Sequence, residues 1–150
     1  MANSVTIERQ VAAPPEAVFR AASDFPRAAG RIRAILKIEM LTEGPVGRGT
    51  RFRETRKMFG REASEVMEVI EFDPPRRYLL GAESHGCRYR TEFAFEPRDG
   101  GTGMRMTFGA EPLTFFAKVM SVLMRPMMKL MVRECGKDLD DLKASVESGK

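Results

Sequence analysis

The sequence predicts an α+β domain in which a curled antiparallel sheet of about seven strands wraps a long C-terminal helix, with two short helices after the first strand. In the last third of the chain, apolar residues recur every three or four positions, which is typical of a helix. The middle of the chain consists of short segments separated by turns rich in Gly and Pro. No repeat or linker interrupts the 150 residues, so we expect a single domain over residues 1–150.

The N-terminal region predicts one strand followed by two short helices. Apolar and polar residues alternate over residues 5–11, as in an amphipathic strand. Pro15 and Glu16 suit the first turn of a helix, because proline fits that position and a carboxylate is stabilised there by the helix dipole. We expect this helix to end near Asp24, and a second short helix to cover residues 27–32.

The middle of the chain predicts a meander of about six antiparallel strands. They are expected over residues 35–41, 50–58, 61–72, 78–84, 87–96 and 104–111. Phe59 and Gly60 form a tight hairpin turn between the second and third of them. Because only one helix is long enough to fill the concave side of this sheet, the sheet must curl around it.

The C-terminal helix is expected over residues 113–146. Pro126 removes one backbone hydrogen bond and should kink the helix near Val122. The first half is apolar around most of its circumference, so we expect the sheet to cover it on more than one side. The second half carries an ordinary apolar stripe with Cys135 facing the sheet, and its charged residues, including Asp138, are expected to face water.

Composition excludes several function classes. The net charge of +4 comes from scattered Arg residues rather than a basic run, so we expect no nucleic-acid partner. His85 is the only histidine, and Cys87 and Cys135 lack metal-ligand spacing, so no metal site is expected. No Gly-rich phosphate loop is present, and no cofactor is expected. The N-terminal MANSVTIERQ lacks the apolar core of a signal peptide, which predicts a cytoplasmic protein.

The apolar run from Leu113 to Val132 is long enough to suggest a membrane span. However, Lys118, Arg125 and Lys129 lie inside it, and charges at the centre of a spanning helix are costly. We therefore expect no transmembrane segment. An interfacial amphipathic helix stays open as an alternative, which leaves a peripheral membrane contact or a homodimer through this face to be tested.

Three segments resemble the SRPBCC superfamily, which contains the START and birch-pollen-allergen-like proteins, and in particular its polyketide cyclase/dehydrase-like branch. AAPPEAVFRAASDFPR is similar to the opening segment of that branch, GRGTRFRETRKMFGREASEVMEVIEFDPPRRY to its central hairpin, and FEPRDGGTGMRMTF to its last hairpin. The resemblance implies a helix-grip fold, in which a grasp-like sheet surrounds a cavity closed by the terminal helix. The superfamily includes lipid carriers, cyclases and hormone receptors, so no catalytic residue is implied.

The predicted hairpin places charged residues on the concave side of the sheet. With a two-residue turn, Phe52 lies opposite Met67 and Glu54 opposite Glu65, on the face that also carries Arg56. Buried charges need partners. Two structural interpretations are an ion network near the cavity mouth and a one-residue register shift that turns these side chains to solvent. The functional interpretation is a polar spot that orients a ligand or acts as an acid/base pair.

The candidate ligand-binding residues share a predicted place on the inner face of a strand or of the long helix, around one apolar interior that opens near the short helices. They are Phe52, Glu54, Arg56, Glu65, Met67, Tyr78, Tyr89, Phe93, Phe116, Met120 and Met124.

Three functions are compatible with these features. The first is binding of a small hydrophobic or amphipathic molecule of lipid, polyketide or isoprenoid type. The second is a cyclase or dehydratase that uses Glu54, Glu65 or a cavity tyrosine. The third is a protein-binding module that uses the apolar face of the C-terminal helix.

Overall fold

The computed structural model describes residues 4–84 and 86–149, and His85 therefore lies outside the described residues. The strands are β1 Ser4–Val11, β2 Ile35–Met40, β3 Arg51–Met58, β4 Arg61–Asp73, β5 Arg77–Ser84, β6 Cys87–Arg98 and β7 Gly101–Pro112. The α-helices are α1 Pro15–Ala22, α2 Ala28–Arg31, α3 Phe115–Leu123 and α4 Met128–Glu147, and two short 3-10 turns are η1 Phe25–Arg27 and η2 Arg125–Met127.

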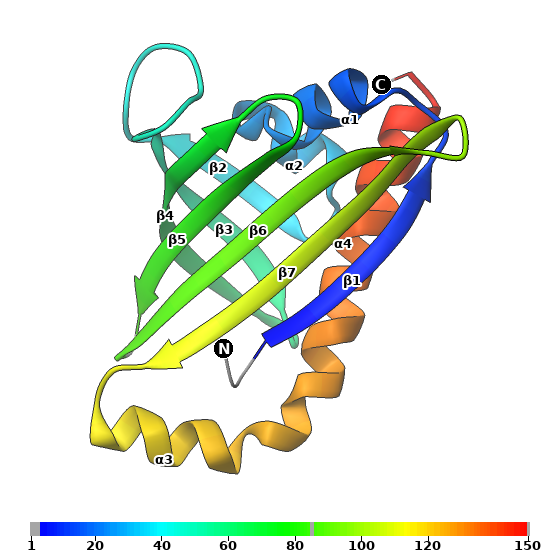
Figure 1. Cartoon of the computed structure of the whole chain (residues 1–150). Coiled ribbons are helices and arrows are strands. Elements are labelled where there is room, and N and C mark those ends of the chain that lie inside the picture. The colour runs from blue at the N-terminus through cyan, green and yellow to red at the C-terminus, as the bar shows by residue number, and fades with distance from the viewer. Residues whose placement is uncertain (1–3, 85, 150) are drawn as a thin grey trace.

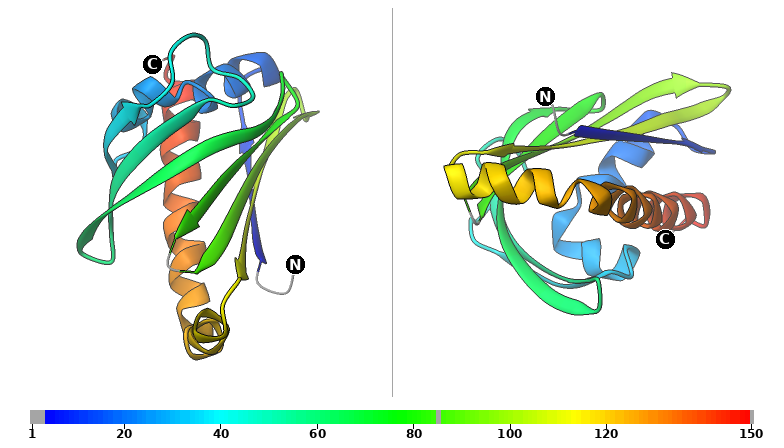
Figure 2. Two further views of the ribbon diagram at one scale, coloured as in Figure 1. Left: turned by 90° about the vertical axis from the view of Figure 1, so that its left-hand side faces the viewer. Right: turned by 90° about the horizontal axis from the view of Figure 1, so that it is seen from below.

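One antiparallel sheet contains all seven strands, in the order β1-β7-β6-β5-β4-β3-β2. The sheet curls so that α4 lies along its concave side, while α1 and α2 cover one end (Figures 1 and 2). This architecture confirms the predicted α+β class, the sheet of seven strands and the two short helices after β1.

The register of the β3–β4 hairpin agrees with the predicted pairing. Phe59 and Gly60 both have positive φ, as the two central residues of a type I′ turn require. Pairing outward from this turn places Phe52 opposite Met67 and Glu54 opposite Glu65. The register shift that would have turned these residues to solvent is therefore excluded.

The hydrophobic core lies between α1, the inner face of the sheet and the second half of α4. Its buried residues are Ile7, Val11, Val18, Phe19, Phe25, Phe52, Val69, Tyr78, Leu80, Phe95, Met104, Met106, Cys135, Leu139 and Leu142. The rings of Phe19 and Phe25 meet the ring of Tyr78 edge to face, and Phe25 stacks on Phe52. This end of the interior is filled by aromatic side chains, so the predicted opening near the short helices is wrong.

The C-terminal helix is broken at Pro126 rather than gently kinked. The amide of Met127 donates to the carbonyl of Met124, which is 3-10 rather than α-helical spacing. The axis changes direction at η2, and α3 extends across the end of the molecule instead of continuing along the sheet (Figure 1). The prediction that the sheet covers the first half of this helix is therefore wrong. Of the two halves, only α4 packs along the concave side of the sheet.

Candidate functional site

A buried ion cluster joins the sheet to α4, with Arg56 at its centre. Nη2 of Arg56 donates to Oδ2 of Asp138 at 2.7 Å and to Oε1 of Glu54 at 3.2 Å. Glu54 is 8% exposed and Asp138 is 7% exposed. We call these three residues the Arg56 cluster.

The alternation of β3 explains why two of the charges point inward. Phe52, Glu54, Arg56 and Met58 occupy successive positions on the concave face of this strand. Phe52 belongs to the core, whereas Met58, at the far end, is half-buried. The Arg56 cluster therefore lies between the packed part of the interior and the end of the sheet nearer α3.

Asp138 belongs to the Arg56 cluster, although the sequence led us to expect this residue to face water. The structure buries it on the same stripe of α4 as Cys135, Leu139 and Leu142. The spacing of these residues, three and four positions apart, places Asp138 on the sheet-facing side. The helical period alone therefore indicates that Asp138 faces the sheet. The prediction that it faces water is wrong because it relied on the charge of the residue and not on its position in the helix.

The cluster contains two acidic groups and one basic group. Burial raises the pKa of Glu54, the neighbouring Arg56 opposes that rise, and the negative charges of Asp138 and Glu65 add to it. Burial also raises the pKa of Asp138, again against the effect of Arg56. Two buried carboxyl groups share one guanidinium, so retaining a proton on one of them is favoured relative to an exposed carboxyl group.

Two polar atoms of the cluster are left for another partner. Among the described residues, Nε of Arg56 and Oδ1 of Asp138 are buried without a hydrogen-bond partner. Buried polar atoms are nearly always bonded to protein, to water or to a ligand. One donor and one acceptor beside the Glu54 carboxyl group therefore have no partner among the described residues.

The inner face of the sheet nearer α3 is apolar and only half-buried. Tyr89, Thr91 and Phe108 lie there, and the rings of Tyr89 and Phe108 stack with centroids 5.9 Å apart. Burial raises the pKa of Tyr89 to about 12, helped by the neighbouring Cys87. The phenol is therefore protonated at neutral pH and can donate a hydrogen bond. We call this area, with Ala82 and Ala110, the open inner face.

Several predicted site residues belong to the core or its border. Phe52 is buried, and Tyr78 is buried with its hydroxyl donating to the carbonyl of Ala22 at 3.2 Å. Burial raises the pKa of Tyr78 well above the ordinary value of a tyrosine. Phe93 stacks on Tyr78, and Phe93 and Met67 are both partly buried against the core. Glu65 is half-buried on the inner face, opposite Glu54.

Two of the three predicted site residues from α3 and its C-terminal end do not line the interior with the others. Phe116 and Met124 are exposed, and Met120 is half-buried on α3. The physical reason is the break at Pro126, which turns α3 away from the concave side before these residues are reached. The expected place of Phe116 and Met124 in one common apolar interior is therefore wrong, whereas that of Met120 stays a prediction.

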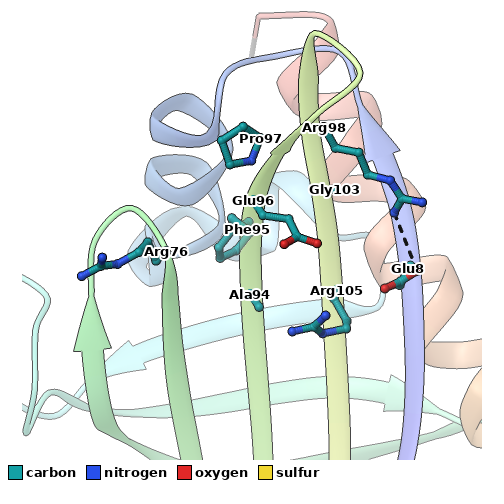
Figure 3. A pocket seen from close by; sticks show the side chains of 9 residues that line it. All are labelled: Glu8, Arg76, Ala94, Phe95, Glu96, Pro97, Arg98, Gly103 and Arg105. Atoms are coloured by element: carbon teal, nitrogen blue, oxygen red, sulfur yellow. Dashed lines mark ion pairs between the residues drawn. The ribbon is translucent and has the colours of Figure 1, made fainter.

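Two surface hollows lie on the outer side of the sheet. One, of about 260 Å³, is bordered by Glu8, Arg98 and Arg105 among others, with Arg98 and Glu8 3.8 Å apart (Figure 3). The other, of about 370 Å³, lies over β4 and β5 and includes Glu83 and Arg90. Oppositely charged side chains line both hollows, and neither reaches the Arg56 cluster. Within the described residues, no group of His, Cys, Asp and Glu side chains could hold a metal ion.

Residues 2–147 match the model of the polyketide cyclase / dehydrase and lipid transport family. The chain belongs to this family. This finding confirms the resemblance to the SRPBCC superfamily drawn from the sequence segments. No curated protein matches the chain significantly.

Solved structures of other proteins show a similar fold. TTHA0849 from Thermus thermophilus is 26% identical, and the match covers 98% of this chain and 99% of that one with a TM-score of 0.78. Ara h 8.0201 is 19% identical over 97% of this chain and 98% of that one, with a TM-score of 0.68. The di-domain ARO/CYC StfQ from the steffimycin biosynthetic pathway is 12% identical over 97% of this chain and 51% of that one, with a TM-score of 0.78.

These likenesses confirm the helix-grip fold for this family member. Within the described residues, none of the helices has the length and apolar character needed to cross a bilayer.

Proposed function

We propose that this family member is a single ligand-binding domain for a small hydrophobic or amphipathic molecule of lipid, polyketide or isoprenoid type. The proposal rests on the fact that the concave side of the sheet has three distinct parts. One end is filled by the aromatic core, the open inner face is apolar and half-buried, and the Arg56 cluster lies between them. An apolar surface with a few convergent polar groups is the usual design of a small-molecule site.

The ligand would lie with its apolar part on the open inner face and its polar group toward the cluster. Nε of Arg56 can donate to a ligand oxygen, and Oδ1 of Asp138 can accept from a ligand hydroxyl group. The Tyr89 phenol offers a second donor on the open inner face. Glu65→Gln is then expected to weaken binding of a polar-headed ligand more than binding of a plain hydrocarbon, because it changes the charge beside Glu54.

The test is native mass spectrometry of the purified protein, combined with titration of a fluorescent apolar probe. Phe108→Glu places a charge on the open inner face and should weaken probe binding on the order of tenfold or more, because an unpaired charge in an apolar site is strongly disfavoured. Thr107→Glu is the matched control, since Thr107 is the neighbouring residue on the outer face of the same strand, within bonding distance of Thr6. Equal loss in both folded variants, or no loss in either, would contradict the proposal.

A second candidate function is a cyclase or dehydratase, favoured by the raised pKa values of Glu54 and Asp138. A carboxyl group with a raised pKa can protonate a leaving hydroxyl group and later take a proton back. If the protein is such an enzyme, the molecule recovered from Glu54→Gln or Asp138→Asn should retain one water that the molecule recovered from the wild type has lost. Identical molecules from all three proteins would leave binding as the function. A cytoplasmic location is part of either proposal.

A further inference from the structure

The surface of α3 presents large apolar side chains to solvent. Phe115 is 82% exposed and Phe116 is 73% exposed, and Val119, Val122 and Leu123 are exposed as well. Single exposed apolar residues are common on soluble proteins, but a contiguous group of this size marks an interaction surface. We call these five side chains the α3 stripe.

Helical geometry places the five residues of the α3 stripe on one side. At 100° per residue they fall within an arc of about 120°. Ala117 lies opposite the middle of that arc and is 3% exposed, so it is the residue that α3 turns toward the body of the protein. The hydroxyl of Thr114 caps the helix by accepting from the amide of Ala117 at 3.1 Å. The stripe is therefore held outward by a fixed, capped helix.

The charged residues within the segment 113–133 are all basic. Residues 113–133 contain Lys118, Arg125, Lys129 and Arg133 and no acidic residue. The net charge of the whole chain is +4, so the remainder of the chain carries equal numbers of acidic and basic residues. All four basic side chains are exposed. The net positive charge of the protein is thus concentrated beside its most exposed apolar surface.

From this combination we infer that α3 docks on an anionic lipid bilayer, with the α3 stripe inserted at the level of the headgroups and the four basic residues paired with lipid phosphates. A helix with bulky apolar residues on one side and Lys and Arg beside them lies in the plane of such an interface. The long stems of Lys118 and Arg125 allow their charges to reach the phosphates while α3 lies flat.

Docking by α3 would bring the open inner face next to the bilayer. The amide of Leu113 donates to the carbonyl of Gly86 at 2.8 Å, which fixes the start of α3 at the β5–β6 end of the sheet. Cys87 and Tyr89 follow Gly86 on the inner side of β6. In Figure 1, α3 lies across this end of the molecule, opposite the end that carries α1 and α2. The bilayer contact itself requires no bound ligand.

The absence of tryptophan from the chain gives a direct reporter. Phe116→Trp introduces a single tryptophan in the α3 stripe, and Leu36→Trp introduces one at an exposed apolar position of β2 as the control. With unilamellar vesicles of phosphatidylcholine and phosphatidylglycerol, we expect a blue shift of emission and quenching by brominated lipid for Phe116→Trp only. Vesicles of phosphatidylcholine alone should give little signal, and added salt should weaken binding.

Co-sedimentation with the same vesicles then separates the apolar from the charged contribution. Phe115→Ser with Phe116→Ser should weaken binding by at least about tenfold, whereas Leu36→Ser with Leu41→Ser should leave it unchanged. Lys118→Gln with Arg125→Gln should weaken binding to anionic vesicles on the order of tenfold. Its charge-matched control is Arg20→Gln with Arg48→Gln, because both residues are exposed on elements at the other end of the molecule.

Three results would overturn the inference. They are a lack of binding to anionic vesicles, equal binding to neutral vesicles, and equal effects of the α3 variants and their controls. Dimerisation of the wild type that the two Phe substitutions abolish, without vesicle binding, would assign the α3 stripe to a second copy of the chain instead. Each result is independent of whether the open inner face binds a ligand, because both assays use the protein with vesicles alone.

Discussion

Arg56 on β3 and Asp138 on α4 are 82 positions apart in sequence and joined by a hydrogen bond of 2.7 Å. This contact ties the sheet to the helix across the concave side. Because Arg56 also bonds Glu54, removing one guanidinium leaves two buried carboxyl groups without their counter-charge.

We expect Arg56→Met to lower the free energy of unfolding by about 3–5 kcal/mol, the usual effect of stripping a buried charge of its partner. Arg53→Met is the control, because Arg53 lies on the same strand but pairs with Glu39 at the surface, at 3.7 Å. The control should change the free energy by less than about 1 kcal/mol. Urea denaturation measures both, and similar losses in the two variants would argue against a structural role for the cluster.

The raised pKa of Glu54 predicts a specific dependence of stability on pH. In the folded state, Glu54 keeps its proton at pH values where the unfolded chain, with the ordinary pKa of 4.5, has lost it. The free energy of unfolding should therefore fall as pH rises from about 4.5 through the raised folded pKa, and then level off. Asp138 adds a fall of the same sign, beginning from its ordinary pKa of 3.8.

Glu54→Gln should reduce this fall, because the amide does not ionise. Thermal melts across the acidic to neutral range give the measurement, and Glu62→Gln, at an exposed position of the same hairpin, gives the control. A fall of unchanged size in Glu54→Gln would show that ionisation of this carboxyl group does not oppose folding.

Tyr78 should contribute to stability rather than to ligand binding, because its hydroxyl bonds the carbonyl of Ala22 inside the packed core. Tyr78→Phe should cost about 1 kcal/mol through the lost hydrogen bond, and Tyr78→Ala about 3–5 kcal/mol through the cavity it leaves. Neither folded variant should change the affinity for an apolar probe by more than about twofold, since Tyr78 is distant from the open inner face in the register of the sheet. A large loss of probe binding in Tyr78→Phe would show that the Tyr78 hydroxyl contributes to ligand binding after all.

Gly101 is required by the close approach of β1. A methyl group at this position would collide with the backbone carbonyl oxygen of Val11, which cannot move without disturbing the edge of the sheet. Gly101→Ala should destabilise the fold by about 1–3 kcal/mol, as overpacking does. Gly47→Ala is the control, because a methyl group there meets no heavy atom within 4 Å. Equal stability of the two variants in a thermal melt would contradict this account.

The sheet could be predicted from the sequence because the patterns that specify its strands and turns are local. Alternation identified the strands, and the two-residue turn at Phe59 and Gly60 fixed the pairing that places Glu54 and Arg56 inward. Each of these features depends on residues close together in the chain. The inward side of β3, and with it two members of the Arg56 cluster, followed without knowledge of any distant contact.

The remaining parts depend on contacts that periodicity does not encode. Pro126 predicts a break, but the direction of α3 beyond it depends on what the helix packs against, so Phe116 and Met124 were wrongly placed inside. Asp138 sits on the buried stripe, and its partner Arg56, far away in sequence, reduces the cost of burying its charge. A charged residue on an apolar helical stripe opposite an inward-facing charge of opposite sign is the pattern that would have identified it.

The sheet is left unclosed, since β1 and β2 form its two edges and do not pair with each other. Between them lies α4, held by side chains such as Asp140, which bonds Arg9 at 2.6 Å, and Asp141, which pairs with Arg33 at 3.1 Å. The width of the interior is therefore set by side-chain contacts of α4 and not by a closed ring of strands joined by backbone hydrogen bonds. A small tilt of α4 would therefore change the width of the interior without breaking any strand pairing.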